Sequence, residues 1–185
     1  MNNKIDVAII IGSSSDLVSV TETIEVLKKF KLSYSLNIAS AHRTHNHLKQ
    51  CIKLAENSNA KVFIAVAGMS AALPGIIASE TILPVIGVPV YSKSLSSFDS
   101  LFSIVQMPKG VPVATVAIGK AGAANAAILA ARIIAVTADN LKVKLRNFKD
   151  KMSDDIIKED LKLKEYGLKK YLCLLKKSKK IDLKG

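Results

Sequence analysis

Residues 5–12 read Ile-Asp-Val-Ala-Ile-Ile-Ile-Gly, and this stretch decides the fold. A β-branched, nearly uninterrupted apolar run is typical of a strand that is buried on both faces of a sheet. Residues 13–16, Ser-Ser-Ser-Asp, are good turn and N-cap residues, and apolar side chains follow at helical spacing over 17–30. The chain therefore opens with a buried strand, a turn and a helix.

The same alternation of strands and helices continues along the chain. Further strands are expected at 33–39, 61–66, 84–88 and 112–118, and helices at 45–57, 73–80, 95–106 and 121–138. Such alternation predicts an α/β fold in which a parallel sheet is covered by helices on both faces.

Five segments that follow predicted strands should meet along one rim of the sheet, where α/β proteins bind their ligands. These segments are residues 12–16, 40–43, 67–75, 87–93 and 119–122. We expect the chemistry of the protein at this rim.

Composition and charge narrow the class of protein. The chain has 185 residues, 49% of them hydrophobic, which is enough for one domain with a sizeable core. Its formal net charge is +12, of which residues 141–185 carry +8. These late bases are Lys apart from Arg146 and have few aromatic neighbours, whereas a specific nucleic-acid surface more often uses Arg and stacked aromatics. We therefore interpret them as a solvated helix face and do not expect a nucleic-acid partner.

After about residue 140 the sequence is typical of a long, Lys-rich amphipathic helix, weakened at Gly167. A stripe of apolar residues can form on it: Ile156, Ile157, Leu161, Leu168, Leu172 and Leu175. We expect a catalytic α/β domain over 1–150 and a helical extension over 151–185.

No apolar run reaches the ~18–20 residues that a membrane span needs, and the first residues lack the layout of a signal peptide. Cys51 and Cys173 lie far apart, match no metal spacing and are interpreted as structural thiols. A reduced, cytoplasmic protein without a membrane partner is expected.

Two rim segments carry polar side chains suited to a phosphorylated ligand. Residues 12–16, Gly-Ser-Ser-Ser-Asp, place a glycine and hydroxyls at a helix start, where free N–H groups favour phosphate, and Asp16 could accept from ribose hydroxyls. Residues 40–44, Ser-Ala-His-Arg-Thr, follow the second strand. His42 could move a proton near neutral pH and Arg43 could grip a phosphate, although a surface or capping histidine fits the same pattern.

Other rim motifs are less specific. His45 and His47 raise the question of a metal site, but without Cys or carboxylate partners they are interpreted as surface residues. Residues 67–75, Ala-Gly-Met-Ser-Ala-Ala-Leu-Pro-Gly, allow a tight turn with backbone donors or simply a compact strand–helix junction. The Gly-x-Ser-x-Gly motif of hydrolases is absent.

Taken with 83–90, 99–116 and 117–127, these segments make the chain resemble the 5-(carboxyamino)imidazole ribonucleotide mutases from about residue 5 to about 150. The most specific blocks are Ser-Ile-Val-Gln-Met-Pro at 103–108 and Ala-Gly-Ala-Ala-Asn-Ala at 121–126. The resemblance implies a three-layer αβα sandwich with a parallel, flavodoxin-like sheet, a homo-octamer, a ribonucleotide substrate and no metal or organic cofactor. It implies an isomerase of purine biosynthesis that moves a carboxylate from the exocyclic nitrogen of an aminoimidazole ribonucleotide to a ring carbon.

Carried over residue by residue, the resemblance makes His42 the catalytic histidine. It assigns substrate-binding positions in the three rim segments: Ser13, Ser15, Asp16, Ser40, Arg43, Gly68, Met69 and Ser70. The family usually has a histidine within Ala-Ala-His-Leu-Pro-Gly, and this chain has Ala72 there. The alternatives are an aminoimidazole ribonucleotide carboxylase that uses free carbon dioxide and a non-catalytic module that binds nucleotides or nucleic acid.

Overall fold

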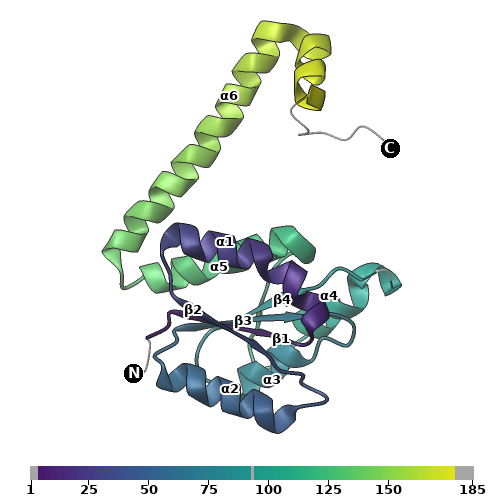
Figure 1. Cartoon of the computed structure of the whole chain (residues 1–185), viewed down its shortest axis with the longest axis vertical. Helices are drawn as coiled ribbons and strands as arrows, with labels where there is room; N and C mark the ends of the chain where they lie inside the picture. The colour runs from purple at the N-terminus through teal and green to yellow at the C-terminus, as the bar shows by residue number, and fades with distance from the viewer. Residues whose placement is uncertain (1–3, 93, 178–185) are drawn as a thin grey trace. The chain divides into compact units, whose positions relative to one another are not determined.

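The computed structural model describes residues 4–92 and 94–177 and contains the expected parallel sheet (Figure 1). Its five strands are β1 (Val7–Ile11), β2 (Tyr34–Ile38), β3 (Val62–Ala67), β4 (Val85–Pro89) and β5 (Ala114–Thr115). All four strand pairings are parallel, and the order is β2-β1-β3-β4-β5. This is the flavodoxin-like order, in which the direction of winding reverses between β1 and β3.

Helices cover both faces of the sheet, as Figure 1 shows. One face carries α1 (Thr21–Phe30) and α5 (Gly119–Ala135), and the other carries α2 (His45–Asn57) and α3 (Leu73–Glu80). Helix α4 (Phe98–Val105) packs against β4 and β5, and two 3₁₀ turns, η1 (Ser14–Val20) and η2 (Ser94–Ser97), follow β1 and β4. The fold is therefore a three-layer αβα sandwich, which confirms the expected class.

The alternation of side chains along the buried strands divides the core between the two faces. Ala8 and Ile10 of β1 pack in a cluster with Leu48 of α2 and Ile77 of α3. Their neighbours in β1 point to the opposite face, where α1 and α5 lie, because successive side chains of a strand alternate. All of β1 is buried, as the apolar run predicts.

Two glycines allow close approaches, one between α4 and the sheet and one between α5 and the segment that precedes it. A Cβ added at Gly87 in β4 would overlap Ile104 of α4, and one added at Gly122 in α5 would overlap the carbonyl oxygen of Ala117. The buried hydroxyl of Thr23 in α1 donates a 2.8 Å hydrogen bond to the carbonyl of Ala123 in α5. These contacts fix the positions of α4 and α5.

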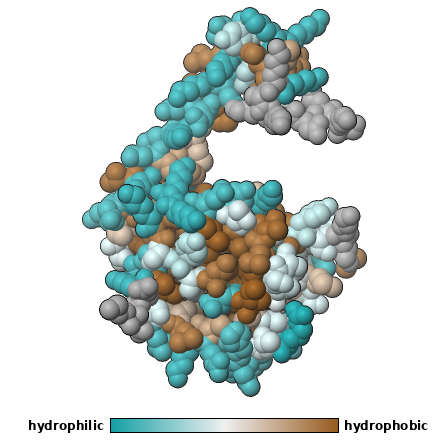
Figure 2. Space-filling view, in the orientation of Figure 1, coloured by the Kyte–Doolittle hydropathy of each residue, from teal (hydrophilic) through white to brown (hydrophobic). Residues whose placement is uncertain are grey.

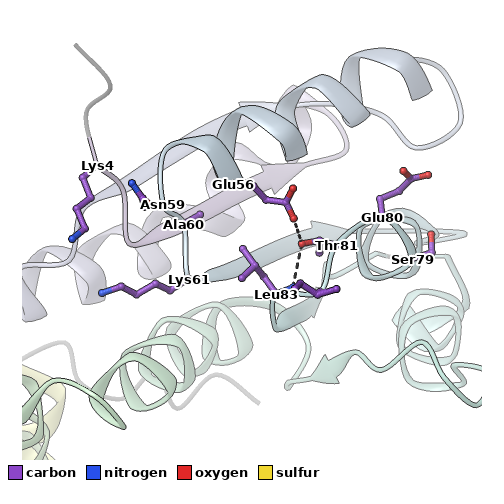
Figure 3. A pocket seen from close by; sticks show the side chains of 10 residues that line it. Lys4, Glu56, Asn59, Ala60, Lys61, Ser79, Glu80, Thr81 and Leu83 are labelled. Carbon is purple, nitrogen blue, oxygen red and sulfur yellow. Dashed lines mark hydrogen bonds between the residues drawn. The ribbon is translucent and has the colours of Figure 1, made fainter.

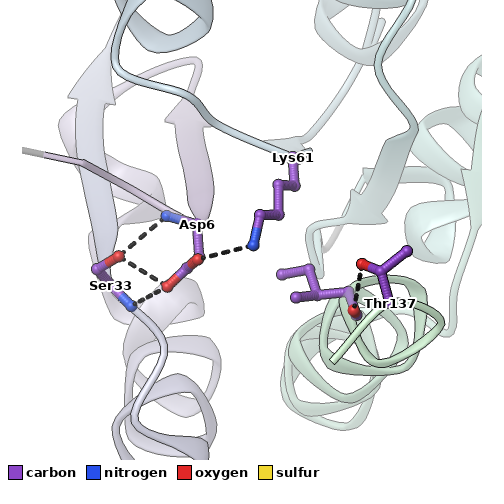
Figure 4. A network of polar contacts seen from close by, with 5 residues as sticks. Asp6, Ser33, Lys61 and Thr137 are labelled. Carbon is purple, nitrogen blue, oxygen red and sulfur yellow. Dashed lines mark hydrogen bonds and ion pairs between the residues drawn. The ribbon is translucent and has the colours of Figure 1, made fainter. Parts of the chain in front are cut away.

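A polar network joins the amino ends of three strands (Figure 4). The Asp6 carboxylate accepts hydrogen bonds from the backbone N–H and the hydroxyl of Ser33, at 3.0 and 2.8 Å. It also lies 3.4 Å from the Lys61 ammonium. Burial raises the pKa of Asp6, but the hydrogen bonds from Ser33 and the charge of Lys61 outweigh burial and hold the pKa below its usual value.

Several sequence-based boundaries were wrong, and the helix expected over 121–138 is among them, since α5 spans Gly119–Ala135. The strand expected over 112–118 is only Ala114–Thr115, since Pro112 cannot donate to a ladder and β5 is an edge strand. The helix expected over 17–30 is 3₁₀ up to Val20 and becomes α-helical at Thr21. The helix expected over 95–106 begins only at Phe98, because residues 95–97 adopt left-handed backbone angles.

The chain divides into two compact units, residues 1–142 and 143–185. Helix α6 (Asp139–Lys177) runs across this division and also across the domain boundary that we expect at residue 150. The boundary at residue 150 therefore stays a prediction. Gly167, with φ 68° and ψ 162°, interrupts α6 and separates two helical segments. The weakness predicted at Gly167 is thus a break.

The surface of the C-terminal unit is mainly hydrophilic, with apolar side chains exposed among its lysines (Figure 2). The most exposed are Val143, Met152, Ile156, Ile157, Leu161 and Leu168. Among the described residues, no helix combines the length and apolar character needed to cross a membrane.

Candidate functional site

A pocket of about 620 Å³ lies at the carboxyl ends of β1, β2, β3 and β4. Four of the five predicted rim segments contribute to it. All nine predicted site residues line it: Ser13, Ser15, Asp16, Ser40, His42, Arg43, Gly68, Met69 and Ser70. The fifth segment, 119–122, does not line this pocket, although a Cβ added at Gly119 would come within 3.9 Å of Tyr91 Cβ beside it.

The loop after β1 is shaped by its own hydroxyls and acid. The Ser13 side chain caps η1 by accepting from the Ser15 backbone N–H at 3.4 Å. The Ser15 hydroxyl donates to the Asp16 carboxylate at 3.3 Å. Burial raises the pKa of the Asp16 carboxyl, and the hydrogen bonds from Ser15 and Ser13 offset only part of that rise. Asp16 is thus a half-buried acceptor facing the pocket.

The loop after β2 carries the predicted histidine and arginine. The Ser40 hydroxyl accepts from both the backbone N–H and Nε of Arg43, each at 3.3 Å. One terminal nitrogen of Arg43 lies 3.5 Å from the carbonyl oxygen of Gly12, so the guanidinium reaches the β1 loop. His42 is exposed at the pocket, and within the described residues its imidazole has no hydrogen-bond partner.

The loop after β3 includes a residue in an unfavourable conformation. Met69 has a φ of 55°, a left-handed angle that favours glycine, and 68% of the residue is exposed. Ala72, at the position where the resembled family usually has histidine, is half-buried in the pocket wall and precedes the first residue of α3. Neither its methyl group nor Met69 can transfer a proton.

The loop after β4 contributes residues that the sequence motifs did not single out. Val90, Tyr91 and Ser92 line the pocket, and Tyr91 is the aromatic residue among its described lining. The expected rim segment 87–93 includes Tyr91, but no motif marked the residue as functional. Its position just beyond a buried strand was the available signal.

The other two histidines and the cysteines lie apart from this pocket. His45 and His47 are exposed on α2, and His47 Nε2 lies 3.6 Å from the sulfur of Cys51. Cys51 is buried, and burial raises the pKa of its thiol, whereas Cys173 is exposed. Among the described residues, no cluster of three or more His, Cys, Asp or Glu could hold a metal ion.

A second cavity, of about 850 Å³, lies at the amino end of the sheet (Figure 3). Lys4 and Lys61 lie on one side of the cavity and Glu80 on the other. The Thr81 hydroxyl donates to Glu56 and accepts from the backbone N–H of Leu83 at 3.2 Å. None of the predicted site residues lines this cavity.

The fold and the position of the first pocket define a doubly wound α/β protein whose candidate site lies where the winding reverses. The crystal structure of PurE from Treponema denticola is similar, with a TM-score of 0.79 and 33% identity over 85% of this chain and 98% of that one. The family model described as AIR carboxylase matches residues 6–155. The chain belongs to this AIR carboxylase family.

Relatives called N5-carboxyaminoimidazole ribonucleotide mutase match over most of both chains. The protein of Saccharolobus solfataricus is 50% identical over 151 residues, which are 82% of this chain and 94% of the relative. The protein of Escherichia coli K12 is 46% identical over 156 residues, 84% of this chain and 92% of the relative. The resemblance stated from the motifs is confirmed.

Proposed function

We propose that this protein is an isomerase of de novo purine biosynthesis. It converts 5-(carboxyamino)imidazole ribonucleotide into 4-carboxy-5-aminoimidazole ribonucleotide. The main support is the convergence of His42, Arg43 and the Ser13–Asp16 loop on one pocket. The mutase relatives at 46–50% identity support the same reaction.

His42 acts as the acid and then as the base of the reaction. Protonation of the carbamate nitrogen releases carbon dioxide from the substrate and leaves the aminoimidazole ring. The ring carbon then attacks the carbon dioxide, and loss of the proton from that carbon restores aromaticity. One imidazole can supply the first proton and remove the second, because a histidine side chain serves both as a general acid and as a general base. The pocket must keep the carbon dioxide beside the ring between these steps.

The polar loops hold the ribose phosphate of the substrate. The Arg43 guanidinium spans the β1 and β2 loops and can donate paired hydrogen bonds to phosphate. Ser13, Ser15 and Ser40 add hydroxyl donors in the same wall, and the Asp16 carboxylate accepts from ribose hydroxyls. Gly68, Met69 and Ser70 bind the substrate from the β3 loop.

The protein works in the cytoplasm as a homo-octamer and needs no metal or organic cofactor. The family resemblance supports the octamer, together with the run of small residues in α5. Light scattering tests the assembly, and a monomer would refute it. Catalysis belongs to the domain of residues 1–150, so a protein that lacks residues 160–185 of the extension should retain turnover.

A spectroscopic assay tests the reaction itself. Purified protein is mixed with 5-(carboxyamino)imidazole ribonucleotide, or with 5-aminoimidazole ribonucleotide and bicarbonate. Efficient conversion of the first substrate without bicarbonate is expected. Turnover that requires bicarbonate would instead identify a carboxylase.

A further inference from the structure

The lining of the pocket at the carboxyl ends of the strands divides into two chemically different halves. The β1 and β2 loops contribute hydroxyls, the Asp16 carboxylate and the Arg43 guanidinium. The β3 and β4 loops and the start of α3 contribute mainly apolar surface, from Met69, Leu73, Val90 and Tyr91, and in addition the hydroxyls of Ser70 and Ser92. A ribonucleotide has the same division, with a polar ribose phosphate and a planar ring that is apolar on its faces.

Tyr91 presents the largest flat surface of the apolar half. The residue is 71% exposed, although only Val90 separates it from the fully buried strand β4. An aromatic ring held at a pocket can stack on a planar heterocycle with little loss of conformational freedom. Tyr91 therefore has the chemistry and the place of a stacking surface.

The backbone on both sides of Tyr91 is held by two fully buried hydroxyls. Ser97 Oγ accepts from the Ser92 N–H at 2.8 Å and lies 3.1 Å from the Ser92 carbonyl oxygen. The Ser100 hydroxyl donates to the Ser97 carbonyl oxygen at 3.0 Å, and its Oγ also lies 3.3 Å from the carbonyl oxygen of Val90. Ser97 and Ser100 have no solvent exposure, and a buried hydroxyl is costly unless it is hydrogen-bonded. The two serines thus fix the residues that flank Tyr91.

The fold adopts unfavourable backbone angles to place these serines. Leu95, Ser96 and Ser97 have φ values of 48°, 49° and 67°, in the left-handed region that non-glycine residues rarely occupy. Ser97, at the end of this turn, precedes α4, whose close packing on β4 requires Gly87.

We propose that Tyr91 positions the substrate by stacking its ring on the aminoimidazole ring, while the polar half holds the ribose phosphate. The inference rests on the proposed function. The apolar half of the pocket then holds the ring in place beside His42 while the carboxylate is detached and re-attached. The ring face of Tyr91, rather than its hydroxyl, makes this contact.

The test compares a ligand that has the heterocycle with one that lacks it. Calorimetry measures binding of 5-aminoimidazole ribonucleotide and of ribose 5-phosphate to the wild type and to Tyr91→Ala, Tyr91→Leu and Tyr91→Phe. Loss of the ring should weaken ribonucleotide binding about tenfold, as expected for base–aromatic stacking, and leave ribose 5-phosphate binding within about twofold. Tyr91→Phe should bind both ligands like the wild type.

Tyr166→Ala is the matched control, because it removes a tyrosine that does not line the pocket. Equal weakening of both ligands in Tyr91→Ala and Tyr91→Leu would assign Tyr91 a merely structural role and overturn the proposal. A loss in Tyr91→Phe as large as that in Tyr91→Ala would also overturn it, since phenylalanine keeps the ring. If the wild type lacks mutase turnover, the proposed function fails independently of the result for Tyr91.

Discussion

Each end of the sheet carries a cavity, and the larger of the two contains none of the predicted catalytic and binding residues. At the amino end, in about 850 Å³, the two acids that line the cavity have partners: Glu80 lies 2.9 Å from Lys49, and Glu56 accepts from the Thr81 hydroxyl. At the carboxyl end, in about 620 Å³, His42 faces the pocket without a hydrogen-bond partner among the described residues. The kind of side chain that lines a cavity, here a histidine that can carry a proton, therefore distinguishes the candidate site better than volume does.

Replacement of His42 by Asn should have the largest effect at either end. We expect turnover to fall by about 10²-fold or more, as removal of a general acid–base does, while substrate binding and the fold persist. Steady-state kinetics and circular dichroism measure both. His45→Asn, in which the histidine is outside the pocket, is the control and should retain turnover. Near-normal turnover in His42→Asn would show that His42 is not the catalytic acid and base. The pocket at the carboxyl end would then no longer differ from the other cavity in containing a catalytic residue.

Arg43→Ala should produce the next largest effect at the same end. Loss of charge-assisted hydrogen bonds to phosphate should raise KM about tenfold or more with a smaller change in kcat. Initial-rate measurements across substrate concentrations separate the two parameters. An unchanged KM would show that phosphate is held elsewhere.

At the amino end, Asp6→Asn should affect stability rather than catalysis. Near neutral pH we expect a loss of about 1 kcal/mol in the free energy of unfolding, because the carboxylate accepts from Ser33 and faces Lys61. Since folding lowers the pKa of Asp6, its contribution is complete well above the ordinary value of 3.8 and is lost as pH falls through the folded-state pKa. Urea unfolding of both proteins at several pH values checks this.

A constant difference in the free energy of unfolding between the wild type and Asp6→Asn down to pH 3 would contradict this assignment. Because both proteins contain all the other acidic residues, the pH dependence that those residues cause cancels in the difference.

Thr81→Val should have the smallest effect. It removes a hydroxyl that joins Glu56 to the N–H of Leu83, and we expect a loss of about 0.5–1 kcal/mol in unfolding free energy with turnover within about twofold. Thermal unfolding and the mutase assay measure both. A large loss of turnover would show that the cavity at the amino end takes part in the reaction.

Most of the fold could be predicted because buried strands and amphipathic helices leave strong patterns. The apolar run before Gly12 predicted β1, and the predicted limits of α2 and α3 agree with the structure. Tertiary contacts decided the remainder. β5 is short at the sheet edge, and the left-handed turn at 95–97 is accompanied by two hydrogen bonds between the Ser97 hydroxyl and the backbone of Ser92. Hydrogen bonds of this kind cannot be predicted from the spacing of apolar residues, because they join two serines in a loop.

The candidate site was predictable where residue chemistry and strand ends coincided. His42, Arg43 and Asp16 were expected at the rim, and the structure brings them into one pocket, while their catalytic and binding roles stay predictions. Tyr91 was missed because one aromatic residue after a strand resembles any surface tyrosine. The left-handed angle of Met69 was also invisible, since nothing in its side chain favours that conformation.

The strand order also has a consequence for folding during synthesis on the ribosome. β1 is made first, yet in the sheet it lies between β2 and β3, and β3 ends only at Ala67. At roughly 5–20 residues per second, about 3 to 11 s pass between synthesis of Ile11 and of Ala67. During that interval the five apolar residues of β1 lack one of their two pairing strands. Strand β1, the stretch that decides the fold, is therefore also the apolar segment that stays incompletely paired for the longest time during synthesis and is exposed to aggregation in that interval.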